Sequence, residues 1–252
     1  MTNTITTTPW ALRFRPNPQA KLRLFCLHYA GGGASVFQPW AGLLPPQIEL
    51  WAVQLPGRER RLREAPFVRM APLADAVVDA LRPLIDRPFA LFGHSMGALL
   101  SFELTRRLRR EGGPQPVAML VSAHRAPNLP RRERPIHNLP EPELIDELRR
   151  LNGTPEEVLS HPELLELLLP LIRADFAACE TYQYAEEPPL DCPISAFGGL
   201  GDPLVNREEL EAWSSHTTAA FSARVLPGDH FYLHKSRPML LQALTIDLRP
   251  YL

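Results

Sequence analysis

Short apolar segments rich in β-forming residues alternate along this chain with amphipathic helical patterns. Strands that are apolar throughout are typical of a sheet covered on both faces. Parallel strands need crossover connections, so this alternation favours a mostly parallel central sheet flanked by helices. We therefore predict an α/β fold, with helices at 73–84 and 99–110 and strands at 22–27, 50–55, 89–92, 117–121, 194–197 and 223–226.

Between about residues 127 and 187 the alternation stops, and helical patterns occur without a convincing strand. Thr154 and Ser160 stand where capping boxes would start two short helices. The second helix is apolar on more than one face, so it must be covered on most sides or line an apolar cavity, and packing is favoured. Pro170 predicts a kink or a break in it. We expect a single domain over residues 1–252 that contains this helical insertion.

Charge and hydropathy exclude several classes of protein. The 252 residues carry 27 basic and 28 acidic side chains, and this balance provides no overall field for nucleic acid or a membrane surface. The longest apolar stretch, 164–172, is far shorter than the roughly 20 residues of a membrane span. The Thr-rich residues 1–9 lack the features of a secretory signal. We expect a cytoplasmic protein that binds neither nucleic acid nor membrane.

The three cysteines are odd in number and widely spaced. This pattern favours buried reduced thiols over a disulfide framework or a zinc site. We expect no bound metal, and structural roles for Cys26, Cys179 and Cys192.

The segment Gly93-His94-Ser95-Met96-Gly97 fits the pattern G-x-S-x-G between an expected strand and an expected helix. In such a sharp strand-to-helix turn, a serine is held exposed above the sheet and small glycines relieve the crowding around it. We therefore predict that Ser95 is a nucleophile. His94 lies inside the turn, and we expect it to pack rather than react.

A serine nucleophile needs a histidine base and a carboxylate that orients the base. Of the eight histidines, those before or inside the insertion are set aside, which leaves His216, His230 and His234. His230 directly follows the last expected strand, where the active sites of parallel sheets assemble. We favour His230 as the base. His234, one helical turn later, is the second choice, and His216 lies in a polar turn.

The orienting acid is expected in a loop after an earlier strand, and Asp202 follows the segment 194–197 in this way. The segment 117–121 is followed by Ser122-Ala123-His124, which contains no carboxylate. Asp191 precedes its strand and would lie at the wrong end of the sheet, whereas Asp229 is adjacent to the base and cannot easily orient it. We favour Asp202, and a turn-initiating Asp-Pro pair is the alternative role.

Acyl transfer also needs hydrogen-bond donors for a tetrahedral oxyanion. The backbone N–H after the nucleophile, that of Met96, is one expected donor. The segment Leu27-His28-Tyr29-Ala30-Gly31-Gly32-Gly33 follows the first long strand and would supply the second, with Ala30 favoured over Gly31. A phosphate-binding loop is disfavoured because the spacings G-x-x-x-x-G-K and G-x-G-x-x-G are absent.

Together these segments resemble the discrete type II thioesterases that serve nonribosomal peptide and polyketide synthases. The resemblance covers nearly the whole chain and also includes Pro56-Gly57-Arg58 and segments 153–159, 171–176, 198–203 and 228–231. It implies the α/β-hydrolase fold, with the helical insertion as a mobile lid over an acyl chamber. It also implies hydrolysis of acyl groups from the phosphopantetheine arm of an acyl or peptidyl carrier protein, chiefly to clear aberrant thioesters. Ser95 would be the nucleophile, His230 the base and Asp202 the acid, with no metal or other cofactor.

Other functions use the same residues. A small-molecule carboxylesterase or a macrocyclising acyltransferase would have the same triad and differ only in its lid and mouth. A catalytically dead binding protein is disfavoured because all three triad residues are present. The chain begins at its own Met1 without an obvious carrier segment, so we expect a free-standing enzyme. We also expect a monomer.

An acidic carrier protein would need basic surface near the mouth of the site. Two groups are candidates, although a solvated face is the simpler interpretation of each: Arg58, Arg60, Arg61 and Arg63, and Arg131, Arg132 and Arg134.

Overall fold

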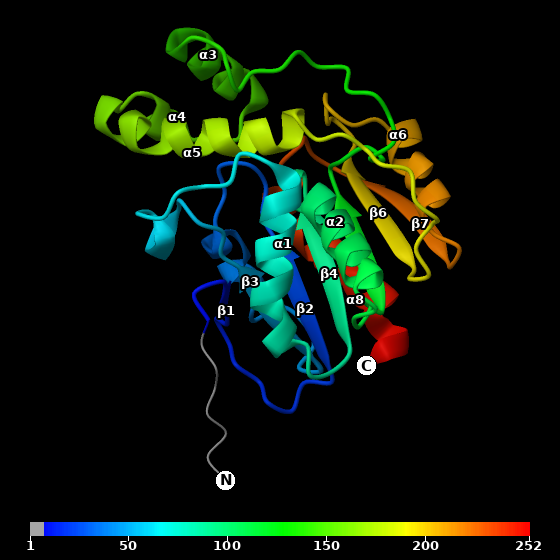
Figure 1. Cartoon of the computed structure of the whole chain (residues 1–252). Coiled ribbons are helices and arrows are strands. Elements are labelled where there is room, and N and C mark those ends of the chain that lie inside the picture. The colour runs from blue at the N-terminus through cyan, green and yellow to red at the C-terminus, as the bar shows by residue number, and fades with distance from the viewer. Residues whose placement is uncertain (1–7) are drawn as a thin grey trace.

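A seven-stranded sheet forms the centre of the computed structural model, which describes residues 8–252 (Figure 1). Most of the Thr-rich N-terminus that we expect not to be a secretory signal therefore lies outside the described residues. The strand order is β1-β3-β2-β4-β5-β6-β7, with β1 antiparallel to β3 and the other neighbours parallel. The strands are β1 (Ala11–Leu12), β2 (Leu22–Leu27), β3 (Ile48–Val53), β4 (Phe89–His94), β5 (Ala118–Ser122), β6 (Ile194–Gly199) and β7 (Phe221–Leu226).

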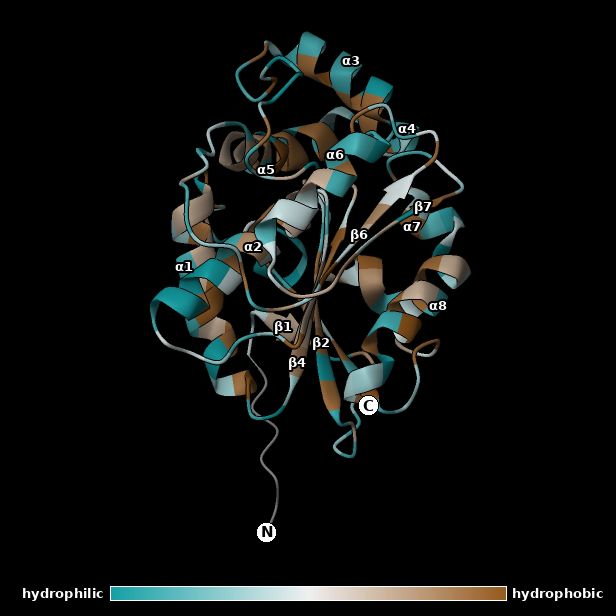
Figure 2. Cartoon of the chain, turned by 90° about the vertical axis from the view of Figure 1, so that its right-hand side faces the viewer, coloured by the Kyte–Doolittle hydropathy of each residue, from teal (hydrophilic) through white to brown (hydrophobic). Residues whose placement is uncertain are grey.

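Helices cover both faces of this sheet (Figure 2). One face is covered by α1 and α2, whose apolar residues pack on β2 and β4, and the other by α8 and the short helix η1. The α-helices are α1 (Met70–Leu81), α2 (Met96–Arg110), α3 (Glu141–Leu151), α4 (Glu156–Leu159), α5 (Pro162–Glu180), α6 (Arg207–Glu211), α7 (Tyr232–Lys235) and α8 (Arg237–Leu248). The 3-10 helices are η1 (Ala34–Trp40), η2 (Glu59–Arg61), η3 (Arg82–Leu84), η4 (Ala212–His216) and η5 (Arg249–Tyr251).

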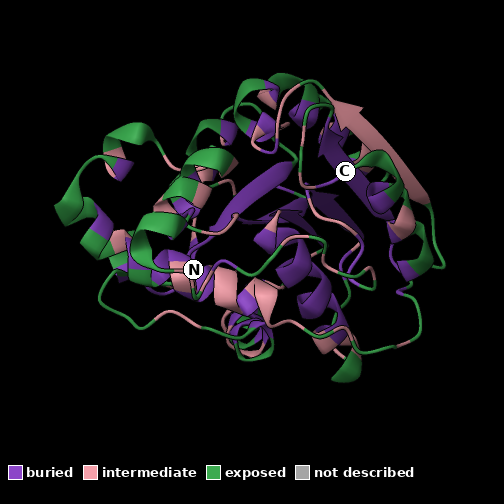
Figure 3. Ribbon diagram, turned by 90° about the horizontal axis from the view of Figure 1, so that it is seen from above, coloured by how far each residue is buried: buried purple, intermediate pink, exposed green. Residues whose placement is uncertain are grey.

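The predicted α/β architecture is confirmed, and the six predicted strands and two predicted helices differ from the observed ones only at their ends. β2 spans the predicted residues, whereas β3 lies slightly earlier than the predicted segment 50–55. The central strands are buried on both faces, which explains their uninterrupted apolar sequences. β7 lies at an edge and is half-buried (Figure 3), and β1 is too short to leave a periodic pattern.

The segment between β5 and β6 contains the helices α3, α4 and α5. The predicted break at Pro170 is wrong. α5 is a long helix that continues through Pro170 without a break. Its C-terminal half is buried against the rest of the molecule through Leu171 and Ile172, and this packing offsets the cost of an interior proline, about 3 kcal/mol.

The predicted capping boxes are also wrong, because α4 begins after Pro155 and α5 after His161, and neither end has a side-chain cap. In both cases a proline near the first turn sets the helical start, since its fixed φ suits that position.

The expectation that the leucines of α5 are covered on most sides fails near its N-terminus. Leu164 and Leu167 are 41% and 49% exposed there, where the helix projects beyond the sheet (Figure 1).

Within residues 8–252, no helix combines the length and the apolar character that a membrane span requires.

Candidate active site

Ser95 occupies a sharp turn between the end of β4 and the start of α2. Its backbone has φ 53° and ψ −116°, a conformation that is uncommon for a residue with a side chain and that is often found at functional sites. A methyl group on Gly93 would lie 2.0 Å from the backbone oxygen of Gly97, and one on Gly97 would lie 2.1 Å from that of Leu27. Both glycines are therefore required by close backbone approach, as the motif predicts.

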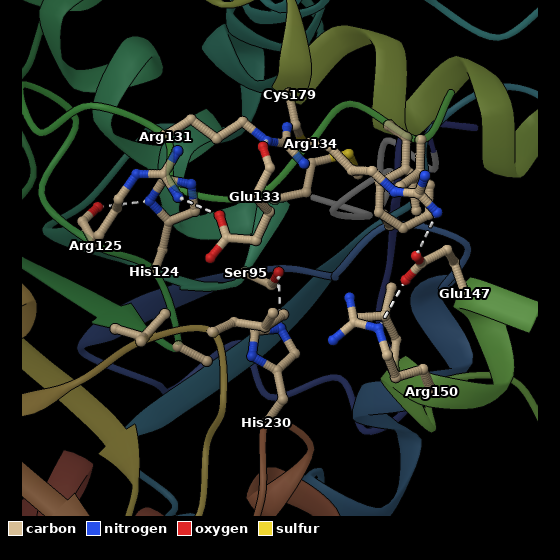
Figure 4. Close-up of a pocket in the computed structure, with 18 residues that line it drawn as sticks. Ser95, His124, Arg125, Arg131, Glu133, Arg134, Glu147, Arg150, Cys179 and His230 are labelled. Carbon is tan, nitrogen blue, oxygen red and sulfur yellow. Dashed lines mark hydrogen bonds and ion pairs between the residues drawn. The ribbon is translucent and has the colours of Figure 1, made fainter. Parts of the chain in front are cut away.

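The structure brings Ser95, His230 and Asp202 together from three loops at the carboxyl ends of the strands. The Ser95 hydroxyl donates to Nε2 of His230 at 3.0 Å (Figure 4), and Nδ1–H of His230 donates to Oδ2 of Asp202 at 2.9 Å. A carboxylate only accepts, so Nδ1 carries the imidazole proton and the Nε2 lone pair faces the serine. This arrangement allows His230 to accept the hydroxyl proton during nucleophilic attack.

The second carboxylate oxygen of Asp202, Oδ1, holds this side chain in place. Its side chain is fully buried, and Oδ1 accepts the backbone N–H of Leu204 at 2.8 Å. The His230 side chain is 8% exposed. The base is thus oriented by a carboxylate that is itself fixed by the loop after β6.

The competing candidates lie elsewhere. His234 Nε2 is hydrogen-bonded to the Tyr29 hydroxyl at 3.1 Å, and His216 Nε2 is bonded to the amide oxygen of Asn128. The other carboxylates have local partners: Asp229 accepts the N–H of Phe231, and Asp191 accepts the hydroxyl of Thr218.

A second hydrogen-bond chain reaches the backbone of His230, the candidate base. Nε2–H of His94 donates to the backbone carbonyl of His230 at 2.9 Å, and Nδ1 of His94 accepts the Ser122 hydroxyl at 2.8 Å. The Tyr232 hydroxyl in turn donates to Ser122 Oγ at 2.5 Å. Burial, reinforced by His230, lowers the pKa of His94 well below its usual value, so this ring stays neutral.

His94 packs in the interior as predicted, but the sequence analysis missed Ser122 and Tyr232. The only signals for them were a serine at the end of a buried strand and a tyrosine two residues after the base. A buried hydroxyl requires a partner, yet the sequence does not say which one.

The predicted oxyanion donors, Ala30 and Met96, line the same cavity as Ser95. Among the described residues, neither of their backbone N–H groups has an acceptor in the protein. The alternative donor, Gly31, is already engaged, because its N–H donates to Oδ2 of Asp175 at 2.8 Å. Two residues of the Ser95 cavity therefore have backbone N–H groups without an acceptor among the described residues, and an oxyanion hole requires such donors.

The cavity beside Ser95 and His230 has a volume of about 320 Å³. The loop after β5 and the helices α3 and α5 form much of its wall, so the helical insertion roofs the candidate nucleophile. The apolar wall includes Ile136, Leu151, Phe176, Leu204 and Val205. Charged side chains also reach it, and of these the sequence analysis singles out only Arg131 and Arg134 as candidates for the mouth of the site: Arg125, Arg131, Glu133, Arg134, Glu147 and Arg150.

Two arginines share one carboxylate on this wall (Figure 4). Glu147 accepts from Nη2 of Arg134 at 2.9 Å and from Nε of Arg150 at 2.7 Å. The two arginine side chains are 62% and 57% exposed, whereas Glu147 is 14% exposed. The cluster therefore carries an excess positive charge at the solvent-accessible side of the cavity.

The two predicted basic groups differ in the structure. Arg58 and Arg61 are buried, so the first group is not a surface patch, and only Arg60 and Arg63 of it are exposed. In the second group, Arg132 and Arg134 are exposed, and Arg131 is partly buried and paired with Glu180.

The three cysteines are free thiols, with Cys26 and Cys192 buried as expected. Cys179 is only partly buried and lines the cavity, but burial raises the pKa of its thiol far above the usual value, so it is not a thiolate. Within the part of the chain that the structure describes, no cluster of three or more His, Cys, Asp or Glu side chains is placed to hold a metal.

Comparisons with known proteins identify the family of this chain. A family model described as a thioesterase domain matches residues 22–246. The gramicidin S biosynthesis protein GrsT of Aneurinibacillus migulanus is 46% identical over 240 residues, which cover 95% of this chain and 94% of the relative.

Two solved structures are also similar over most of their length. RedJ, a thioesterase from the prodiginine biosynthetic pathway in Streptomyces coelicolor, has 44% identity and a TM-score of 0.87, covering 92% of this chain and 88% of its own. The type II thioesterase BorB from the borrelidin biosynthetic cluster has 42% identity and a TM-score of 0.88, covering 96% and 98%.

Proposed function

The chain belongs to the thioesterase family and is a thioester hydrolase, and we propose that Ser95, His230 and Asp202 are its catalytic triad. Its function is that of a type II thioesterase in nonribosomal peptide or polyketide synthesis. The observation that carries the residue assignment is the continuous hydrogen-bonded chain from Ser95 Oγ through His230 to Asp202 at the wall of a cavity.

Acylation begins when Ser95 Oγ attacks the thioester carbonyl carbon while Nε2 of His230 takes the hydroxyl proton. The N–H groups of Ala30 and Met96 bind the oxyanion that forms. The carbon–sulfur bond then breaks, and the sulfur takes the proton from His230 as the thiol leaves. A thiolate is a good leaving group, so this protonation matters less than it does in amide cleavage.

Deacylation repeats these steps with water. His230 removes a proton from a water molecule, whose oxygen attacks the acyl-serine carbonyl, and the same two N–H groups bind the second oxyanion. The ester bond to Ser95 breaks, Oγ regains a proton from His230, and the carboxylic acid leaves. The cycle uses side chains, backbone amides and water, and we propose that it needs no metal or organic cofactor.

We further propose that the substrate is an acyl group on the phosphopantetheine arm of an acyl or peptidyl carrier protein. The cavity beside Ser95 suits an extended arm, and the helices α3 to α5 form a lid within a single domain. The excess positive charge at Arg134 and Arg150 suits an acidic carrier protein. The free cysteines suit the reducing cytoplasm. We expect a monomer, which light scattering tests directly.

The decisive experiment follows the intact mass of an acylated carrier protein incubated with the wild-type enzyme or with Ser95→Ala. The matching acyl-pantetheine and a simple oxygen ester of the same acid are measured in parallel. We expect rapid loss of the acyl mass with the wild type only, and faster turnover on the carrier protein than on free pantetheine. Turnover of the oxygen ester with no loss from the carrier would favour a small-molecule carboxylesterase instead.

A further inference from the structure

A buried ion pair joins the lid to the loop that carries the proposed oxyanion donor. Arg58 follows β3 and Asp175 lies on α5, and their side chains are 5% and 2% exposed. The contact is bidentate, with Nη1 of Arg58 bound to Oδ2 and Nη2 to Oδ1, both at 2.8 Å. This is the geometry in which guanidinium and carboxylate groups bind most specifically.

Both members of the pair also bind backbone groups of the loop after β2. Asp175 Oδ2 accepts the N–H of Gly31 at 2.8 Å, and Nη1 of Arg58 donates to the carbonyl of Gly32 at 3.1 Å. The Arg58 Nε–H donates to the carbonyl of Pro56, which ties the loop after β3 into the same network. One lid carboxylate thus orders two loops of the hydrolase core.

This network decides which backbone amide is available to the substrate. Ala30 and Gly31 are adjacent, and the Gly31 N–H is directed at Asp175, whereas among the described residues the Ala30 N–H has no acceptor. The Gly31 N–H lies in the Ala30–Gly31 peptide, and the Asp175 carboxylate fixes the plane of that peptide. The Ala30 N–H lies in the preceding peptide, whose Tyr29 carbonyl accepts the N–H of Gly32 at 3.0 Å, and Arg58 holds the carbonyl of Gly32. An oxyanion hole stabilises the transition state only when its donors are held in place beforehand.

The pair also connects this loop to the position of the lid. On the turn of α5 before Asp175, the side chain of Ile172 lies against Gly31, and that of Leu171 lies near Gly57. A movement of α5 away from the core would therefore withdraw the Asp175 carboxylate from both Arg58 and Gly31. A buried guanidinium left without its carboxylate is strongly unfavourable, so the closed position of α5 is favoured whenever the loop is ordered.

We propose that Asp175 and Arg58 are positioning residues that hold the Ala30 N–H in its oxyanion-binding orientation only while α5 is seated on the core. This inference rests on the proposed serine mechanism. It predicts that loss of the pair weakens binding of the tetrahedral transition state more than binding of the substrate.

The test uses Asp175→Asn, which keeps the size of the side chain but loses the charge. We would measure kcat and KM on an acyl-pantetheine thioester, together with the affinity for two analogues of that substrate. A trifluoromethyl ketone forms a tetrahedral adduct with Ser95, and a thioether mimics the unreacted substrate. We expect kcat and trifluoromethyl ketone affinity to fall together by about 10- to 100-fold, with thioether affinity changed by less than about threefold.

Asp247→Asn is the matched control. Asp247 on α8 forms a similar bidentate pair with Arg224 on β7, outside the cavity. This variant should lose thermal stability while keeping kcat and the trifluoromethyl ketone affinity. If circular dichroism shows that Asp175→Asn is unfolded, Arg58→Lys serves instead, since a lysine keeps the charge but cannot form the bidentate contact.

The outcomes separate this inference from the proposed function. If Asp175→Asn or Arg58→Lys loses stability as Asp247→Asn does but keeps kcat and analogue affinity, the pair is only structural and the inference is overturned. If wild-type enzyme does not hydrolyse thioesters, or Ser95→Ala remains active, the serine mechanism itself fails.

Discussion

The imidazole of His94 donates from Nε2 to the backbone carbonyl of His230 at 2.9 Å, so the residue beside the proposed nucleophile supports the proposed base. Its other nitrogen accepts the Ser122 hydroxyl. Both contacts require a neutral ring with one donor and one acceptor. Burial keeps the pKa of His94 low enough for the ring to stay in that state.

We predict that His94→Phe lowers both stability and kcat. The substitution removes the acceptor of the Ser122 hydroxyl and the donor to the buried carbonyl of His230, at a cost of about 2 kcal/mol in the free energy of unfolding. The loop that carries His230 loses a support, so kcat should fall about tenfold while KM changes little. Urea unfolding and steady-state kinetics measure the two effects. Thr105→Val, which removes a buried hydroxyl within α2, should reduce stability without lowering kcat. An unchanged kcat in His94→Phe would show that this support is not needed for catalysis.

Replacing Asp202 by asparagine should be far more damaging to kcat. An amide can donate to Nδ1 of His230, which would move the imidazole proton to Nε2 and prevent that atom from accepting the serine proton. We expect kcat on acyl-pantetheine to fall by about 10³- to 10⁴-fold, with little change in KM. Asp229→Asn is the control, because Asp229 adjoins the base but binds the N–H of Phe231. Comparable losses in both variants would contradict the assignment of Asp202.

Acid should destabilise the protein partly through His216. Burial, reinforced by Arg106, lowers the pKa of His216 to about 4, below that of an unfolded histidine, about 6.5. The unfolded chain therefore binds more protons below about pH 6.5, so this stabilisation is complete above that pH and is lost as the pH falls toward 4. At pH 4.5 the loss should be about 2 kcal/mol.

His216→Gln tests this origin of the acid sensitivity. Glutamine can still donate to Asn128 but does not titrate. Urea unfolding between pH 7 and pH 4.5 should show a shallower decline for the variant than for the wild type. Parallel pH profiles of the two proteins would exclude His216 as a source of the acid sensitivity.

Charge reversal at Arg134 and Arg150 should affect carrier-bound substrates selectively. Glutamates at these positions next to Glu147 would make the rim of the cavity negative and repel an acidic carrier protein. We expect KM for the acylated carrier to rise about tenfold at low ionic strength, and the effect to shrink at high salt because of screening. KM for free acyl-pantetheine should change much less.

Arg60→Glu with Arg63→Glu is the control for net charge, since these side chains are exposed but do not line the cavity. Equal effects of the two charge reversals would mean that the carrier responds to the overall charge of the enzyme. If the charge reversal at Arg134 and Arg150 does not change KM for the acylated carrier, the docking surface lies elsewhere.

Local sequence was informative wherever a strand or a turn imposes its own requirements. The turn around Ser95 was predictable because Gly93 and Gly97 are needed for backbone atoms to approach closely. The position of His230 after the last strand was predictable because parallel strands present their carboxyl ends at one edge of the sheet.

The length of α5 was not predictable in the same way. Pro170 is a strong local signal for a break, but tertiary packing of the helix outweighs that preference. The role of Arg58 was also hidden, since its surroundings in sequence suggest an exposed basic cluster. Only the folded chain places Asp175, far away in sequence, against it and makes burial of the guanidinium favourable.

The sequence by itself determined the strand and helix alternation and the sharp turn at Ser95, because each depends on the chemistry of neighbouring residues. It also placed the proposed acid, Asp202, and the proposed base, His230, in loops that follow strands later in the chain. The tertiary structure alone decided that Asp175 engages the Gly31 N–H, that the Ala30 N–H has no acceptor among residues 8–252, and that His94, Ser122 and Tyr232 support the proposed base. These contacts join segments far apart in the chain. Their partners are chosen by how the lid, the loops and the sheet pack together, which no local pattern encodes.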